Sequence, residues 1–309
     1  RNEGVKSNVL GKPMKEPQDV PFEKEGQYLK SDNRSNISYF LEHNVLLRRF
    51  TLSVGVLANY NSALNEGIHF YPGIDASYRI GDNFRLYGSW NRALRMPTFT
   101  DLYYEGKTNK GNPDLKPEES EAFEVGLKYN TYFLRAHIAG FYRKGKNMID
   151  WVKEKPEDIW ESRNLTKVDN LGFETNLSLL PRELGNERFF IRKIELGYAF
   201  IHQDKDSEGY ISNYALDYLK HKFTAQLSHS IWKGFSATWY VRWQDRAGSY
   251  TKYENLKPAY EEPYSPYCLV DMKVNWEYQR LNLYAELNNL LNSTYYDLGN
   301  IPQPGIWFK

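Results

Sequence analysis

The fold of this chain is decided by residues 92–118, which read R-A-L-R-M-P-T-F-T-D-L-Y-Y-E-G-K-T-N-K-G-N-P-D-L-K-P-E. The three prolines of this stretch lack the backbone N–H that a strand donates to its neighbour, and its two glycines permit turns. The runs on either side, residues 84–90 and 123–129, alternate apolar and polar side chains, which is typical of strands. We therefore predict one long loop, the signature loop, between two antiparallel strands.

The same alternation recurs along most of the chain, and each run is close to the ~10 residues that a tilted strand needs to cross a membrane. It predicts about twelve strands, at residues 37–47, 50–60, 71–80, 84–90, 122–129, 132–143, 170–179, 193–202, 222–231, 235–244, 268–276 and 281–288. Residues 1–34 are polar and show no such periodicity, so we predict a lead-in or extracellular loop there.

The connections between these strands alternate in length. Short turns are predicted at residues 48–49, 81–83, 130–131, 232–234 and 277–280. Long loops are predicted at residues 61–70, 92–118, 148–169, 203–221, 245–267 and 291–305. Short turns at one end and long loops at the other are typical of outer-membrane barrels. Residues 180–190 are the exception, a longer connection on the short-turn side.

The two faces of the predicted strands differ in charge. In the strand at 235–244, one face holds Phe235, Ala237, Trp239, Val241 and Trp243, and across all the strands this apolar face contains no Asp, Glu, Lys or Arg. A charge in contact with lipid costs up to about 2–4 kcal/mol at the bilayer midplane. The opposite face carries the charges that we expect to point into a lumen, among them Arg85, Glu124, Arg135, Glu174, Arg242, Asp271 and Lys273.

A soluble β-sandwich also alternates, with its charged face outward. Twelve strands of uniform length leave no chain to cover twelve polar faces, so we predict an all-β fold, an antiparallel transmembrane β-barrel. A helical membrane protein is excluded because mean hydropathy is −0.70 and no apolar run approaches the ~18 residues that a membrane helix needs.

The bulk composition narrows the function. The formal net charge of +1 gives no sign of a nucleic-acid partner, and Cys268 is the single cysteine, so a disulfide framework is excluded. The six histidines show no metal-ligand spacing, and the G-x-S-x-G, H-E-x-x-H and P-loop patterns are absent. We therefore expect no catalytic residues, no metal site and no cofactor, and we do not expect an enzyme.

The two halves of the signature loop, L-R-M-P and G-N-P-D-L-K-P-E, resemble the loop late in the barrels of TonB-dependent outer-membrane receptors of the cobalamin and siderophore type. Residues 287–309 also resemble the ending of that family, with a last strand that starts at Ile306. The resemblance implies the later half of a barrel of about 22 strands. Residues 35–309 would supply about twelve complete strands and the start of a last one, without the N-terminal plug domain.

The resemblance also implies a function, a location and a set of partners. It implies import of a cobalamin-like corrinoid or a ferric siderophore across the outer membrane of a Gram-negative bacterium. The implied partners are the small-molecule ligand, outer-membrane lipid, the plug and early barrel strands, and a TonB-type energy-coupling complex that pulls on the plug. Whether a surface lipoprotein caps the loops is left open. Haem receptors of the family place a His between the two loop halves, and residues 93–117 contain none, so haem is disfavoured. The resemblance is closer to the cobalamin-type receptors, so it ranks a corrinoid first and a ferric siderophore second.

Aromatic and basic side chains in the long loops are the candidate ligand-binding residues, because aromatic rings offer rigid contact area and a cation can orient an anion. They are Tyr103, Tyr104, Trp151, Trp160, Arg163, Tyr250 and Tyr253. The alternative is that these rings pack the loops on one another. Tyr210, Tyr214 and Tyr218 recur at every fourth residue and would share one face if their loop contains a short helix, where we expect them to pack that helix rather than to contact ligand.

Two functions from other classes remain open at this stage. Twelve strands could close as a smaller porin-like channel that has no plug and needs no TonB. A soluble β-rich surface protein that binds glycans would carry its charged faces outward and would need no detergent.

Overall fold

The computed structural model describes residues 1–309 except 24–25, 65–66, 156, 186–187, 207–208, 213–217, 255–256 and 300. Its strands are β1 Asn2–Ser7, β2 Lys12–Asp19, β3 Gln27–Leu46, β4 Phe50–Asn61, β5 Ile68–Ile80, β6 Phe84–Arg95, β7 Asn109–Lys110, β8 Glu118–Asn130, β9 Leu134–Lys153, β10 Trp160–Leu179, β11 Ile191–Asp206, β12 Ile211–Ser212, β13 Leu219–Trp232, β14 Phe235–Arg246, β15 Ser249–Glu254, β16 Lys257–Pro263, β17 Tyr267–Tyr278, β18 Leu281–Asn288, β19 Tyr296–Leu298, β20 Ile301–Pro302 and β21 Trp307–Phe308. One helical turn, α1 Phe99–Tyr103, and one 3-10 turn, η1 Pro181–Leu184, complete the described elements.

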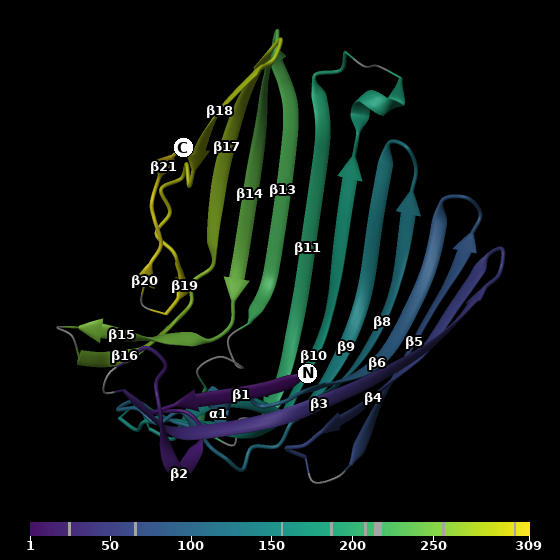
Figure 1. Cartoon of the computed structure of the whole chain (residues 1–309). Coiled ribbons are helices and arrows are strands. Elements are labelled where there is room, and N and C mark those ends of the chain that lie inside the picture. The colour runs from purple at the N-terminus through teal and green to yellow at the C-terminus, as the bar shows by residue number, and fades with distance from the viewer. Residues whose placement is uncertain are drawn as a thin grey trace.

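The long strands form one antiparallel sheet in which neighbours in sequence are neighbours in space. The order β3, β4, β5, β6, β8, β9, β10, β11, β13, β14, β17 and β18 follows the hydrogen-bonded pairs, and each predicted strand corresponds to one of these twelve. The sheet curves into a trough that is open along one side (Figure 1). The predicted all-β antiparallel fold is therefore confirmed, with a barrel wall that does not close on itself.

The two ends of the trough differ as the sequence predicts. The chain turns within two or three residues between β3 and β4, β5 and β6, β8 and β9, β13 and β14, and β17 and β18. These turns run from the top of Figure 1 down its right-hand side. Gly81 and Gly234 take backbone φ angles of 64° and 82° in two of these turns, a left-handed conformation that glycine adopts without strain. The other end holds α1, β15 and β16, and we call it the long-loop end.

A sharp boundary between apolar and charged rows crosses the outward face of β8 to β11. One register row toward the long-loop end holds Glu121, Lys144, Asp169 and Asp204. The next row on the same face holds Phe123, Tyr142, Leu171 and His202. The Tyr142 hydroxyl donates to Asp169 at 2.9 Å and the Trp90 indole N–H donates to Glu121 at 2.8 Å. Aromatic rings with one polar end thus mark the level at which charge begins, as interfacial girdles do.

No helix in the described part of the chain is both long and apolar enough to cross a membrane.

The described strands of the wall contain few buried side chains. The largest side chains that are almost wholly buried lie near the long-loop end, whereas the wall buries small residues such as Ala139 and Ala237; the large ones are Val152, Asn61, Asp150 and Ser162. The packed core of the described residues therefore lies at the long-loop end, in the layer of loops and strand ends that we call the loop layer.

The prediction of an irregular lead-in at residues 1–34 is wrong. This segment contains β1 and β2, and β3 begins at Gln27, so the predicted boundary at residue 35 falls inside a strand. Both β1 and β2 pair antiparallel with β3. Polar strands with no buried core face give little periodicity in sequence, and here the pairing with β3 determines their structure. The extracellular position of this segment stays a prediction.

The predicted long loop at residues 148–169 is also corrected. Strands β9 and β10 continue toward each other as far as Lys153 and Trp160, so residues 154–159 alone connect them. Their pairs keep a single register from Leu134 opposite Leu179 to Val152 opposite Glu161. The loop at 245–267 likewise contains a two-stranded hairpin, β15 with β16. Part of the loop layer is therefore built from strands that leave the wall.

A single charge on the outward face should lower the stability of the protein more than a single charge on the inward face. We expect Val125→Arg, which places a charge on the outward face of β8, to lower the free energy of unfolding in lipid bilayers by about 2–4 kcal/mol. Gln226→Arg, on the inward face of β13, is the matched control and should change it much less. Urea unfolding of the refolded full-length protein measures both. Equal effects of the two substitutions would contradict the assignment of the outward face to lipid.

Candidate functional site

The signature loop is fixed to the wall at its base by an ion pair between a half-exposed arginine and a buried carboxylate. Arg95, the last residue of β6, donates two hydrogen bonds to the Glu118 carboxylate, the first residue of β8, one of them at 2.5 Å. The Glu118 side chain is 10% exposed and also accepts from the Ile149 N–H at 2.7 Å. The hydrogen bonds to Glu118 raise the pKa of Arg95 above its usual value. One carboxylate therefore joins both ends of the loop to β9.

Inside the loop, the backbone is held by a short capped helix. The Thr98 hydroxyl accepts from the Asp101 N–H at 3.1 Å, and the Asp101 carboxylate accepts from the Thr98 N–H at 2.9 Å, a reciprocal capping box for α1. Gly111 packs against the end of α1, where a Cβ atom would lie 2.8 Å from the Tyr103 backbone nitrogen. Its N–H donates to the Tyr104 carbonyl at 2.6 Å. Glycine is needed there because the two backbones approach each other so closely.

The segment missed by sequence reasoning packs against this loop. Lys30, Asp32 and Arg34 are alternate residues of β3 and so share one face. Lys30 pairs with Glu105 at 3.9 Å, and Asp32 accepts from the Tyr103 hydroxyl at 2.5 Å. We call residues 1–35 together with the signature loop the roof.

Arg34 makes three further contacts that join β3 to its neighbours. Its guanidinium donates to the Pro97 carbonyl at 2.6 Å, lies 4.9 Å from the centre of the Phe99 ring, and pairs with Glu3 at 2.7 Å. Its side chain is only 10% exposed. The pattern of alternate charged residues at 30, 32 and 34 was the one signal in the sequence that could have revealed this strand.

Two of the predicted ligand-binding residues, Tyr103 and Tyr104, lie in the roof in different environments. Tyr103 is turned inward to Asp32, and burial together with that hydrogen bond raises the pKa of its hydroxyl. Tyr104 is 38% exposed and meets Trp151 edge to face at 6.4 Å between ring centres. The structure thus brings Tyr104 and Trp151 together, whereas Tyr103 holds β3 to the loop.

Trp160 and Arg163 lie on β10 and contact different neighbours. The Lys153 ammonium lies 4.5 Å from the centre of the Trp160 ring. Arg163 donates to the Tyr210 hydroxyl at 2.5 Å and pairs with Glu161 at 2.9 Å. The hydrogen bond to Glu161 raises the pKa of Arg163. The short helix considered for Tyr210, Tyr214 and Tyr218 would span residues 213–217, which lie outside the described part of the chain.

Tyr250 and Tyr253 occupy the hairpin of β15 and β16 and differ in exposure. Tyr250 is 7% exposed and packs against Tyr264 and Tyr296, each with 5.2 Å between ring centres. Burial raises the pKa of its hydroxyl. Tyr253 is 53% exposed. The packing alternative therefore describes Tyr250, whereas Tyr253 is free to contact a ligand.

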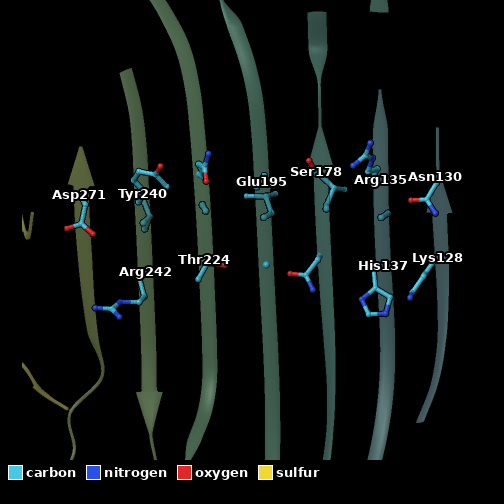
Figure 2. A pocket seen from close by; sticks show the side chains of 18 residues that line it. Lys128, Asn130, Arg135, His137, Ser178, Glu195, Thr224, Tyr240, Arg242 and Asp271 are labelled. Atoms are coloured by element: carbon cyan, nitrogen blue, oxygen red, sulfur yellow. The ribbon is translucent and has the colours of Figure 1, made fainter. Parts of the chain in front are cut away.

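The predicted inward-facing residues line the concave face of the wall. A cavity of ≈ 660 Å³ extends across β8 to β17 and is lined by Arg135, Arg242 and Asp271. Figure 2 shows Asp271 and Arg242 on neighbouring strands at one side, Glu195 near the middle, and Lys128 and Asn130 at the other side. Charged and polar groups from successive strands thus form one continuous lumen surface.

A hydrogen-bonded cluster on the same face was not foreseen. The Tyr87 hydroxyl donates to Glu124 at 2.9 Å and lies 2.7 Å from His137 Nε2. His137 Nδ1 lies 3.8 Å from Glu174. A Cβ atom at Gly126 would lie 2.5 Å from the Tyr87 ring, so the missing side chain is what lets the tyrosine cross to Glu124. Two predicted residues, Glu124 and Glu174, are thereby joined through a tyrosine and a histidine.

The remaining predicted lumen residues are Arg85 and Lys273. Lys273 pairs with Glu286 on β18 at 2.8 Å. Arg85 lies between Arg79 on β5 and Lys128 on β8 in direct register, so three cations are adjacent on one face. Like charges in register repel one another, and an anionic partner in the lumen would relieve that repulsion. Within the described ranges, His, Cys, Asp and Glu form no group of three that could hold a metal ion.

Comparison with known proteins identifies the family. Residues 11–290 match the model of the TonB-dependent receptor-like β-barrel. This chain belongs to the TonB-dependent receptor family and forms part of its outer-membrane β-barrel.

Similar proteins include transporters and receptors for two kinds of ligand. The vitamin B12 transporter of Vibrio vulnificus is 26% identical over 225 residues, which is 55% of this chain and 36% of that protein. The ferrienterobactin receptor of Escherichia coli is 23% identical over 297 residues, 87% of this chain and 38% of that protein. The chain therefore spans about a third of the length of these relatives.

Solved structures share the fold. The ferric enterobactin receptor of Pseudomonas aeruginosa in complex with enterobactin superposes with a TM-score of 0.74 at 18% identity, over 99% of this chain and 49% of that one. The siderophore receptor PirA of Acinetobacter baumannii superposes with a TM-score of 0.69 at 17% identity, over 99% of this chain and 50% of that one. At these identities the likeness concerns the fold alone.

The ion pair at the loop base can be tested directly. Arg95→Gln leaves the Glu118 carboxylate buried without its cation, and a buried group that loses its partner costs ~1–3 kcal/mol. We expect amide hydrogen exchange at Ile149 to accelerate by about tenfold or more, because that N–H bonds to Glu118. Arg85→Gln is the control, since the register neighbours of Arg85 are cations. Equal exchange in both variants would contradict the anchoring role of Arg95.

The two tyrosines of the β15–β16 hairpin should separate packing from ligand contact. We expect Tyr250→Ala to expose the hairpin to limited proteolysis, because it removes a ring that packs on two others. Tyr253→Ala should leave the rate of cleavage unchanged, since the ring is exposed. Cleavage that is equally fast in both variants would show that Tyr253 also holds the hairpin.

Proposed function

We propose that this chain is the loop-bearing wall of a receptor that imports a scarce small molecule, a cobalamin-like corrinoid or a ferric siderophore, through a plugged outer-membrane barrel. The observation that carries the proposal is the match of residues 11–290 to the barrel model of the family. The packed loop layer at one end of the wall supports it, because ligand capture needs rigid side chains held ahead of the lumen.

Corrinoid is the first choice of ligand and siderophore the second. Two of the relatives are vitamin B12 transporters, from Vibrio vulnificus and Photobacterium profundum. The absence of His from residues 93–117 disfavours haem. The similarity to the ferrienterobactin receptor over 87% of this chain is what keeps a ferric siderophore as the second candidate.

In the proposed mechanism, the loop layer captures the ligand and the wall guides the plug. Tyr104, Trp151 and Tyr253 would offer ring surfaces to the ligand, and Trp160 and Arg163 would flank them on β10. A plug and early barrel strands, which are further parts of the proposal, would dock on the inward charges of the wall. Single polar contacts in a wet lumen are worth about 0–1 kcal/mol each, so a TonB-type complex could displace the plug by breaking them in turn.

The other two functions make different demands. A porin-like channel would conduct ions without an energy source. A soluble glycan-binding protein would have to keep the outward apolar rows of the wall in water, where Ile138, Val125 and Leu171 are more than half exposed. A continuous apolar surface of this kind promotes aggregation in water, whereas in a bilayer it contacts lipid.

Uptake measurements test the proposal. The full-length protein is expressed in a strain that lacks its own corrinoid and siderophore receptors, with and without a functional TonB complex. We expect labelled cyanocobalamin, or failing that a ferric siderophore, to accumulate only when the TonB complex is present. Equal uptake with and without the TonB complex, or a steady ion conductance in planar bilayers, would favour the channel instead.

A further inference from the structure

We infer that a pocket on the inner wall beneath the roof binds a ligand group that donates hydrogen bonds and carries no negative charge, such as a carboxamide. The pocket, which we call the amide chamber, has a volume of ≈ 530 Å³ and is formed by the inward faces of β3, β4, β5 and β6. Its rim at the long-loop end is formed by three residues of the roof, Glu3, Arg34 and Met96. The inference rests on the proposed import function and adds a site and a chemical class of ligand to it.

The floor of the chamber is flat because two glycines face each other across β4 and β5. Gly55 and Gly73 are direct register partners. The position of a Cβ atom at Gly73 has no neighbour closer than the Asn91 Cβ atom at 3.6 Å, and the Phe40 ring lies 3.1 Å from the corresponding position at Gly55. The Phe40 ring thus covers Gly55, and a ligand can lie directly on the strand backbone at Gly73, beside that ring.

The wall of the chamber is lined by amide and hydroxyl groups that are not all satisfied. Asn59 donates to Asn36 Oδ1 and to Ser38 Oγ, both at 2.9 Å. Its own Oδ1 has no hydrogen-bond partner in the described part of the protein, and neither has the Tyr71 hydroxyl. Asn59 and Tyr71 are only 6% and 7% exposed.

Unsatisfied buried oxygens are costly and call for an explanation. A buried polar atom without a partner costs ~1–3 kcal/mol. Such atoms are uncommon in native structures, and many belong to functional sites. A ligand that donates hydrogen bonds, with a small rotation of the Asn59 amide, would satisfy both oxygens. The Asn59 Oδ1 atom can only accept, so this observation, which is independent of the shape of the pocket, points to a bound donor.

The charges around the chamber decide which donor. Both lining cations are already paired, Arg34 with Glu3 at 2.7 Å and Arg92 with Glu119 at 3.5 Å. At the inner end, Glu42 accepts hydrogen bonds from Asn44 and Ser53. Asp75 has no ion pair with any residue that the structure describes.

The surplus of carboxylate therefore disfavours an anion and favours an uncharged or cationic donor. Of the two ligand classes under consideration, a corrinoid presents primary carboxamides along its edge and meets this requirement. A ferric tricatecholate is an anion and does not. Arg34 also donates to the Pro97 carbonyl at 2.6 Å, so the rim of the chamber is joined to the signature loop.

The experiment uses the purified full-length protein in detergent and two probes, cyanocobalamin and a ferric tricatecholate. Tyr71→Phe removes one hydroxyl and nothing else, and Asn59→Leu removes the amide at similar volume. Asn275→Leu, an inward amide on β17 far from the chamber in the sheet order, is the matched control. Equal yields and equal heat-dependent gel mobility show that each variant is folded.

We expect the wild type to bind cyanocobalamin, and we expect Tyr71→Phe and Asn59→Leu to weaken that binding by about tenfold or more while Asn275→Leu leaves it unchanged. Tenfold corresponds to the loss of about one hydrogen bond. Unchanged affinity in both chamber variants would overturn the amide chamber and leave the import function intact. Binding of the tricatecholate alone would overturn its ligand class. If the wild type binds neither probe, the proposed ligands and the chamber fall together.

Discussion

The structure depends on one constraint, that a strand inside a lipid bilayer must satisfy every backbone group with its neighbours and present no charge to the hydrocarbon. The ladders from β3 to β18 meet the first half of this requirement through continuous antiparallel pairing. The outward rows meet the second half, and they stop being apolar at one level, where Glu121, Lys144 and Asp169 begin. All other features are built on the side chains that this constraint leaves free.

Those free side chains divide into two groups with different energetics. The inward side chains of the wall form small separate clusters and pairs, and others, such as Arg135 and Lys128, are exposed. The loop layer is packed, with Val152, Asp150 and Ser162 almost wholly buried. The wall is therefore a polar surface suited to contacts that can break, and the loop layer is a small protein core suited to holding rings in fixed positions.

Sequence reasoning succeeded where the bilayer imposes a period and failed where it does not. The twelve wall strands alternate because one face meets lipid, and their short turns follow from the same pattern. Strands β1 and β2 pair with β3 in the roof, and most of their side chains are polar, so alternation carried no signal. Tyr103 and Tyr250 were singled out as candidate ligand-binding residues, and only the structure shows that the Tyr103 hydroxyl donates to Asp32 and that the Tyr250 ring packs on Tyr264.

The single register of β9 and β10 has a mechanical consequence. Their pairs run from the short-turn end into the loop layer without a shift, from Leu134 opposite Leu179 to Val152 opposite Glu161. A pull along the strands would load all of these hydrogen bonds together in shear, so the load on each bond stays small. Contacts made by separate inward side chains would instead be loaded one after another and would fail singly. The paired strands should therefore resist a pull that breaks the inward side-chain contacts one at a time. The difference lies in how the bonds share the force rather than in how strong each bond is.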